Sequence, residues 1–256
     1  MIALLTDFGF KDEYAGVIKG VICSINPRVK IIDLCHEIPA QDILWAALLI
    51  YKSCSFFPAK TIFLCIVDPA VGSKRDIVIV KKDSRYFIAP DNGLLSFIVG
   101  ETRGLEIIKV NPDEIQLQPL SSTFHGRDIF APLAAHLSID NNISRFGAAV
   151  ESIKLIEFPQ PEITDGKIIA MVIQIDRFGN LTTNLERDVF EKLGWKNLEI
   201  QLRDSIIREI SNCYEKKRDS IAIWGSRGLL EIAVPDNSAA DILGLNRGSI
   251  VIIKRK

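Results

Sequence analysis

The first half of the chain alternates short runs of aliphatic and β-branched residues with stretches that have a helical pattern. This order of elements is typical of an α/β fold with a mostly parallel central sheet. The predicted strands are Ile2–Leu5, Val29–Leu34, Thr61–Val67 and Ile77–Val80, and the predicted helices are Glu13–Ile25 and Gln41–Ser55. We expect Asp12 to cap the first helix and the second helix to begin just after Pro39.

The character of the sequence changes near Phe158. Residues 158–166 form a polar stretch with two prolines, which predicts a linker between an α/β domain of residues 1–157 and a second domain of residues 167–256. Short strand-like runs then follow at close spacing, separated by turn residues: Ile168–Ile175, Leu198–Leu202, Ile221–Trp224, Leu229–Val234 and Ser249–Ile253. This spacing predicts a small C-terminal β-barrel or sandwich.

The charge balance and the apolar runs argue against several classes of protein. Lys and Arg number 31 and Asp and Glu number 32, so no net field attracts nucleic acid or anionic lipid. The longest apolar run, Ile43–Tyr51, is far shorter than the roughly 20 residues that cross a bilayer. The first acidic residue comes too early for a signal peptide, and the five cysteines lack CxxC spacing. We therefore expect a cytoplasmic protein with reduced cysteines.

Polar residues gather directly after several predicted strands, which is where open α/β sheets bind their ligands. These clusters are TDFG with the nearby Asp12, DPAVGSKR from Asp68, PDNG from Pro90 and STFHGRD from Ser122. The second domain adds DRFGN from Asp176 and WGSRG from Trp224. One set of polar turns in each domain predicts a site built between domains or between subunits.

Several of these residues also have a purely structural interpretation. Residues 91–93 form a strong turn signal after a proline, and Asp128 is expected to cap the helix that follows it. His36 and His136 are expected to be structural. The loop position of His125, beside an arginine and an aspartate, favours a functional role.

Six stretches together resemble the SAM hydroxide adenosyltransferases, relatives of the fluorinase and the chlorinase. They are LLTDFGFKDEYAGVIKG, VDPAVGSKR, APDNGLL, TFHGRDIFAPLAAHL, DRFGNLTTN and GSRGLLEIAV, in the family's order and over nearly the whole chain. The resemblance implies an α/β N-domain, a C-terminal β-barrel, and a homotrimer with active sites between one subunit's N-domain and its neighbour's C-domain. It also implies hydrolysis of S-adenosyl-L-methionine (SAM) to adenosine and L-methionine, without a metal or a cofactor.

The same resemblance implies roles for individual residues. The family's catalytic set falls on Asp68, Arg75 and His125, where Arg75 would hold the attacking water and either of the other two would accept its proton. The implied substrate contacts are Asp7 for the ribose diol; Asp12, Asp176, Ser226 and Arg227 for the methionine end; and Asn180, Tyr214 and the backbone from Val234 for adenine.

A halogenase of the same family is one alternative at this stage. The fluorinase carries Tyr at the positions of Asp68 and His125, and a Ser that contacts halide at the position of Gly126. A carboxylate beside a bound halide would repel it, so the sequence favours hydrolysis.

Two further alternatives belong to other functional classes. A metal-dependent nucleoside hydrolase would bind a hard cation through Asp7, Asp12 and Asp91, and its activity would be lost in chelator. A SAM or adenosine sensor would use the same recognition residues without turnover, and would leave Asp68, Arg75 and His125 without a task.

Overall fold

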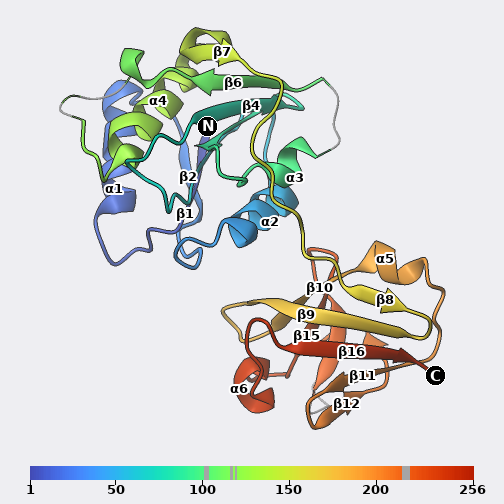
Figure 1. Cartoon of the computed structure of the whole chain (residues 1–256). Helices are drawn as coiled ribbons and strands as arrows, with labels where there is room; N and C mark the ends of the chain where they lie inside the picture. The colour runs from blue at the N-terminus through green and yellow to red at the C-terminus, as the bar shows by residue number, and fades with distance from the viewer. Residues whose placement is uncertain (101–103, 116–117, 119, 215–219) are drawn as a thin grey trace. The chain divides into compact units, whose positions relative to one another are not determined.

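The chain folds into two compact units, Met1–Glu157 and Phe158–Lys256 (Figure 1). The computed structural model describes residues 1–100, 104–115, 118, 120–214 and 220–256. The stretch predicted as a linker, residues 158–166, begins the second unit, and its residues Glu162–Thr164 form the short strand β8.

The first unit is built on a seven-stranded sheet with the order β2-β1-β3-β5-β4-β6-β7. Its strands are β1 (Ile2–Thr6), β2 (Ile31–Cys35), β3 (Ile62–Ile66), β4 (Ile77–Lys82), β5 (Arg85–Pro90), β6 (Glu106–Val110) and β7 (Gly147–Ala149). The four predicted strands are therefore present. β1 pairs in parallel with β2 and β3, and β3 pairs in parallel with β5.

The prediction of a mostly parallel sheet is wrong, because the other half of the sheet is antiparallel. β4 pairs antiparallel with β5 and β6, and β6 pairs antiparallel with β7. The cause is the turn between β4 and β5, where Asp83 and Ser84 both take left-handed φ values of 48° and 60°. Two successive left-handed residues make a tight hairpin, which leaves no room for the crossover that parallel strands require. The sheet is mixed, and the fold is α/β in the broad sense.

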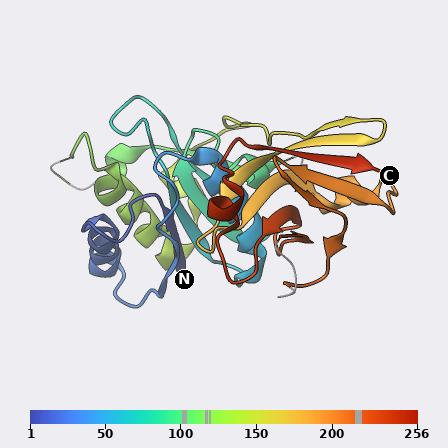
Figure 2. The ribbon, with the colours of Figure 1, turned by 90° about the horizontal axis from the view of Figure 1, so that it is seen from below.

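Helices lie on both sides of this sheet, α1 and α4 on one side and α2 and α3 on the other (Figures 1 and 2). They are α1 (Tyr14–Ile25), α2 (Ile43–Ser53), α3 (Ser96–Val99) and α4 (Ala131–Asp140), with the π-helix η3 (Gly126–Phe130) leading into α4 and short 3₁₀ turns η1 (Cys54–Phe56), η2 (Pro112–Glu114) and η4 (Ile143–Phe146). Asp42 caps α2 by accepting from the Trp45 N–H at 3.0 Å. Asp12 does not cap α1, because the helix begins later and Glu13 occupies its cap position without a side-chain bond.

The core of the first unit follows the two-residue period of its strands. Ile2 and Leu4 on β1 point to the same side as Ile62 and Leu64 on β3, and all four are fully buried. They pack with Ile18 and Ile22 of α1 and with Phe130, Leu133 and Leu137 of the η3–α4 segment. The packing fixes the carboxyl ends of β1 and β3 and the start of η3, which are the places where the polar clusters of the sequence occur.

The second unit is a nine-stranded sheet, almost wholly antiparallel, with the main order β12-β11-β16-β9-β10-β15-β14-β13 and β8 paired to β9. Its elements are β9 (Lys167–Ile175), β10 (Leu181–Glu186), α5 (Arg187–Glu191), β11 (Leu198–Leu202), β12 (Ser205–Ile207), β13 (Ile210–Ser211), β14 (Ile221–Trp224), β15 (Leu229–Ala233), α6 (Ala239–Leu243) and β16 (Ile250–Arg255). All five predicted strand runs are strands. Within the described residues no ladder joins β12 to β13, the two ends of this path. The second unit is therefore nearly barrel-like but has no closing ladder among these residues, and the predicted barrel is borne out only in part.

In neither unit do the described residues include a helix that is both long and apolar enough to cross a bilayer.

Candidate active site

Three side chains that lie far apart in the sequence meet at one edge of the first unit's sheet. Arg75 donates from Nε to Asp68 Oδ2 at 2.6 Å, and its Nη2 lies 2.5 Å from the same oxygen. Arg75 Nη2 also lies 3.0 Å from His125 Nδ1. The side chains of Arg75 and Asp68 are only 6% and 5% exposed, and His125 is 8% exposed. The Asp68–Arg75–His125 group is therefore a nearly dry, connected set of polar side chains.

The arginine fixes the protonation state of the imidazole. A guanidinium has donors and no acceptor, so His125 Nδ1 must offer its lone pair to Arg75. Burial, and then the nearby charge of Arg75, hold the pKa of His125 below its ordinary value, which keeps the ring neutral. A neutral imidazole with a free lone pair on Nδ1 carries its proton on Nε2. His125 therefore presents an N–H donor at Nε2.

Asp68 presents a hydrogen-bond acceptor, whereas His125 presents a donor. Its Oδ2 takes both contacts from Arg75, whereas its Oδ1 is buried and has no hydrogen-bond partner within the described residues. A buried carboxylate oxygen without a donor is costly, by roughly 1–3 kcal/mol or more. Such an oxygen is suited to a donor that comes with a bound molecule.

Close backbone packing brings the two loops together. Asp68 follows β3, and the loop to Arg75 turns through Gly72 at φ +81°. A Cβ on Gly72 would lie 2.2 Å from the carbonyl oxygen of Ser122, so the loop touches the segment that leads to His125. The side-chain amide of Asn92 also holds the start of this loop, because it donates to the Val67 carbonyl at 2.9 Å.

Asp7 lies at the end of β1, the strand next to β3. Its Oδ2 accepts from the Gln41 N–H at 2.9 Å, and its pKa is raised, mainly by burial and further by the charge of Asp68. Asp12 is exposed on the loop before α1. Phe8, Tyr14 and Phe124 make edge-on and tilted ring contacts beside these carboxylates, with centroids 5.1–6.2 Å apart.

His36, Asp128 and His136 lie outside the Asp68–Arg75–His125 group. His36 is buried between Thr6 Oγ1 at 2.7 Å and Asp33 Oδ1 at 3.0 Å, as expected of a structural histidine. Asp128 does not cap a helix, because it lies inside η3, where it accepts from the Ser121 N–H and pairs with Arg127. His136 lies in α4 and is partly buried.

The PDNG segment is the turn that its sequence indicates. Asp91 Oδ1 accepts from the Lys154 N–H at 2.7 Å, which ties the turn to the end of the first unit. Gly93 has φ +99°, and a Cβ there would lie 2.5 Å from Ile156. Among the residues that the structure describes, no three His, Cys, Asp or Glu side chains are grouped so that they could hold a metal ion.

The second unit carries a pocket of about 920 Å³. It is lined by most of the predicted recognition residues of that unit: Asp176, Asn180, Tyr214, Ser226, Arg227 and Val234. Asp176 organises its own turn, since Oδ1 accepts from the N–H groups of Phe178 and Asn180 and Oδ2 accepts from Asn180 Nδ2, each at 2.9 Å. This turn fixes the orientation of the Asn180 amide.

Sequence reasoning missed one acidic residue of this pocket. Glu231, on β15, is 7% exposed and lines the pocket beside Tyr214 and Arg227. The sequence does carry one sign of it, since Glu231 interrupts the apolar run LLEIAV. A charged residue at the centre of a buried strand usually has a partner or a function.

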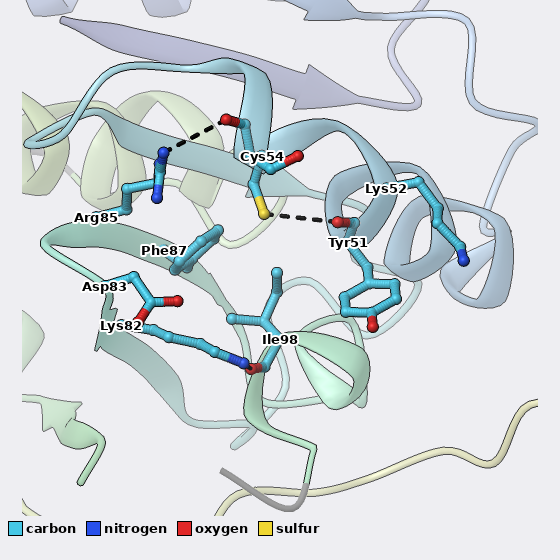
Figure 3. Close-up of a pocket in the computed structure, with 9 residues that line it drawn as sticks. Tyr51, Lys52, Cys54, Lys82, Asp83, Arg85, Phe87 and Ile98 are labelled. Atoms are coloured by element: carbon cyan, nitrogen blue, oxygen red, sulfur yellow. Dashed lines mark hydrogen bonds between the residues drawn. The ribbon is translucent and has the colours of Figure 1, made fainter. Parts of the chain in front are cut away.

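A second hollow of about 340 Å³ lies in the first unit between the end of α2, the β4–β5 hairpin and α3 (Figure 3). None of the predicted site residues lines it. Two of its cations are engaged by main-chain carbonyls, since Lys82 donates to Ile98 O and Arg85 donates to Phe57 O. The third, Lys52, has its Nζ over the Tyr51 ring at 5.4 Å from the centroid. We assign it no role in the site.

Comparison with known proteins identifies both units. The family model described as SAM hydroxide adenosyltransferase N-terminal domain matches residues 2–147, and the model for the C-terminal domain of the same family matches residues 170–252. Proteins named (R)-S-adenosyl-L-methionine hydrolase from Methanocaldococcus jannaschii and Thermus thermophilus are each 33% identical over 96% of this chain, and cover 92% and 96% of the relative. A fluorinase from Actinopolyspora mzabensis is 27% identical over 100% of this chain and 97% of its own.

The fold of the whole chain also matches that of a solved structure. The crystal structure of an uncharacterized conserved protein from Thermotoga maritima superposes with a TM-score of 0.89 at 35% identity, over 100% of both chains.

The packing of Gly72 against Ser122 generates a stability prediction. Gly72→Ala should lower the free energy of unfolding by about 1–3 kcal/mol more than Gly104→Ala, the usual cost of an overpacked contact. Gly104 is a matched control because it has the same φ of +81°, with no atom of the described residues within 4 Å of the position of a Cβ. Chemical denaturation of both variants measures the difference, and equal losses would contradict the contact.

Proposed function

Because the chain belongs to the SAM hydroxide adenosyltransferase family, it is an S-adenosyl-L-methionine hydrolase, and we propose that Asp68, Arg75 and His125 activate the water that it uses. The products are adenosine and L-methionine. The observation that supports the assignment is the buried Asp68 Oδ1, which has no donor within the described part of the chain.

The chemical demand of this reaction lies with the nucleophile. As the water oxygen forms its bond to the ribose 5′ carbon, the C5′–S bond breaks and its electron pair goes to sulfur. The leaving group is then a neutral thioether, so no general acid is required. The water must lose a proton as it attacks, and the site has to provide the acceptor. No metal has a part in this scheme, because the sulfonium itself supplies the positive charge of the electrophile.

Asp68 is the proton acceptor in this scheme. The lone pair of His125 Nδ1 is already taken by Arg75, so the ring cannot receive a proton there, and its Nε2 carries a hydrogen. His125 instead donates from Nε2 and orients the water oxygen. Arg75 places a fixed positive charge beside both groups and favours hydroxide character as the proton moves to Asp68 Oδ1.

The substrate is recognised by groups from both units. Asp7 has two acceptor oxygens for the two hydroxyls of the ribose, and Asp12 serves the methionine end from the exposed loop before α1. In the pocket of the second unit, the amide of Asn180 and the backbone near Val234 read the edge of adenine, and the ring of Tyr214 lies against its face. Ser226 and Arg227 take the methionine carboxylate, beside Asp176.

The sulfonium sulfur of SAM is a stereocentre, and the relatives in question are named for the (R) form. We extend this preference to the present chain. The support is the identity of 33% over 96% of its length.

Halogenation is the less supported alternative. The relatives named hydrolase are 30–33% identical, whereas those named fluorinase are 27–29% identical. The Asp68 carboxylate would lie next to a bound halide and repel it. A sensor without turnover would have no use for the buried oxygen of Asp68.

The first functional prediction concerns Asp68. Asp68→Asn should lower kcat by about 10²–10⁴-fold with little change in KM, because the amide cannot accept a proton. The assay follows adenosine release from SAM in the presence of chelator. With resolved epimers, the wild-type protein should turn over (R)-SAM faster than (S)-SAM. Asp140→Asn is the matched control, since that carboxylate makes only a surface ion pair with Arg145 and a local turn contact. Wild-type turnover by Asp68→Asn would refute its role.

The second prediction concerns pH. Protonation of His125 removes the lone pair that accepts from Arg75, and the pKa of this ring lies below its ordinary value of 6.5. Activity should therefore be intact at neutral pH and fall as the pH drops through that lowered pKa. The His125→Gln variant cannot titrate there, so its acidic limb should move to lower pH. An unmoved limb in the kcat/KM profile of His125→Gln would exclude His125 as its source.

The third prediction concerns assembly. The nucleophile group belongs to the first unit and the recognition pocket to the second, and we propose a homotrimer in which one subunit's first unit completes its site with a neighbour's second unit. Co-refolded His125→Ala and Asp176→Ala chains should then recover activity, because mixed trimers contain some sites with both residues intact. The measurements are adenosine release and mass in solution. Mixed trimers without recovery would contradict the shared site.

A further inference from the structure

Glu231 is a buried carboxylate in the pocket of the second unit for which the scheme above has no use. It lies at the centre of β15, where Thr182 of the neighbouring strand β10 is its cross-strand partner. Only 7% of the residue is exposed, yet it lines the pocket together with Arg227 and Asp176. A carboxylate that is kept out of water in this way requires strong donors or a counter-charge.

The hydrogen-bond donors that the described residues give to Glu231 are weak. Tyr214 OH lies 3.4 Å from Oε2 and Thr182 Oγ1 lies 3.5 Å from Oε1, both longer than the usual O–H···O distance of about 2.5–3.0 Å. Burial, with the charge of Asp176 as a smaller cause, raises the pKa of Glu231, against the opposing effect of Arg227. The carboxylate is therefore under-paired for its burial.

Two other carboxylates of the second unit show what full pairing looks like here. Asp176 accepts three hydrogen bonds of 2.9 Å from its own turn. Glu199, which is also 7% exposed, pairs with Lys256 at 2.8 Å and accepts from Gln201 at 2.9 Å. Glu231 lies 3.4 and 3.5 Å from its donors, so it keeps more capacity for an incoming cation than Asp176 of the same pocket does.

The surroundings of Glu231 indicate what kind of cation fits. A Cβ on Gly225 would lie 2.1 Å from Oε1, so the carboxylate lies against the backbone of the turn that carries Ser226 and Arg227. A cation bound by Glu231 would therefore sit next to an anion bound by Arg227. An ammonium and a carboxylate bonded to the same carbon are the polar groups of an α-amino acid.

We propose that Glu231 binds the α-ammonium group of the methionine part of the substrate and so selects a zwitterionic amino-acid end. This inference rests on the proposed function, and it adds a recognition residue to the methionine end. An ammonium offers three N–H donors, which suits oxygens that lack strong donors. The sulfonium of the same substrate offers none, so the two cationic groups can be told apart by experiment.

The test compares SAM with the analogue in which hydrogen replaces the α-amino group. Glu231→Gln should raise KM for SAM by about 10- to 100-fold, the effect of losing a hydrogen bond between charged partners, and leave kcat within a few-fold. For the analogue without the amino group, wild type and Glu231→Gln should have the same KM. Glu231→Asp, which keeps the charge on a shorter side chain, should give an intermediate KM for SAM.

The matched control is Glu199→Gln, which removes an equally buried charge from the same unit outside the pocket and should leave KM for SAM unchanged. Unchanged KM in Glu231→Gln, or equal losses for SAM and for the analogue, would overturn the proposal. Calorimetry with L-methionine and with adenosine gives a readout that does not depend on turnover: Glu231→Gln should weaken binding of methionine alone. Absence of adenosine formation by wild type would instead reject the proposed function.

Discussion

The hydrogen bonds of one arginine hold the proposed catalytic end of the first unit together. Arg75 lies between Asp68 and His125, and all three side chains are almost completely buried. Because a guanidinium only donates, it determines which atoms of its neighbours act as acceptors. It thereby leaves one acceptor on the aspartate and one donor on the imidazole for the water molecule of the proposed scheme. A lysine would provide the charge without the fixed fork that reaches both partners, so this position is specific to arginine.

The backbone around this arginine is built to bring two distant loops into contact. The loop after β3 has no side chain at Gly72, where it touches the carbonyl of Ser122, and the π-helix η3 begins directly after His125. A π-helical turn within a longer helical segment is rare and frequently accompanies a functional site. The buried residues of β1, β3, α1 and α4 hold both loops on a rigid base, which matters because catalytic geometry tolerates small errors only.

Local patterns in the sequence predicted the strands well and the global pairing poorly. Runs such as Thr61–Val67 are apolar enough to be strands in any arrangement, and β3 occupies Ile62–Ile66. The antiparallel half of the sheet depends on two left-handed residues, Asp83 and Ser84, whose identities are weaker turn signals than Asn-Gly. Motifs in loops were visible because polar residues cluster there. Glu231 was missed because a sequence does not show whether an acidic residue in a strand has close hydrogen-bond donors. In the structure the donors to Glu231 lie 3.4 and 3.5 Å away.

The under-paired carboxylates also suggest how the site distinguishes its substrate from its products. Asp68 and Glu231 each keep acceptor capacity in a buried setting, at a cost to the stability of the free protein. SAM carries two positive groups, the ammonium and the sulfonium, so in the proposed scheme its binding would relieve that cost through electrostatic attraction. Hydrolysis converts the sulfonium into a neutral thioether and divides the molecule into two parts. The attraction to the sulfonium is then lost and each product is held by fewer contacts than the whole. In the proposed scheme, loss of the sulfonium charge therefore weakens the hold on the products relative to SAM, while Glu231 still contacts the ammonium of methionine.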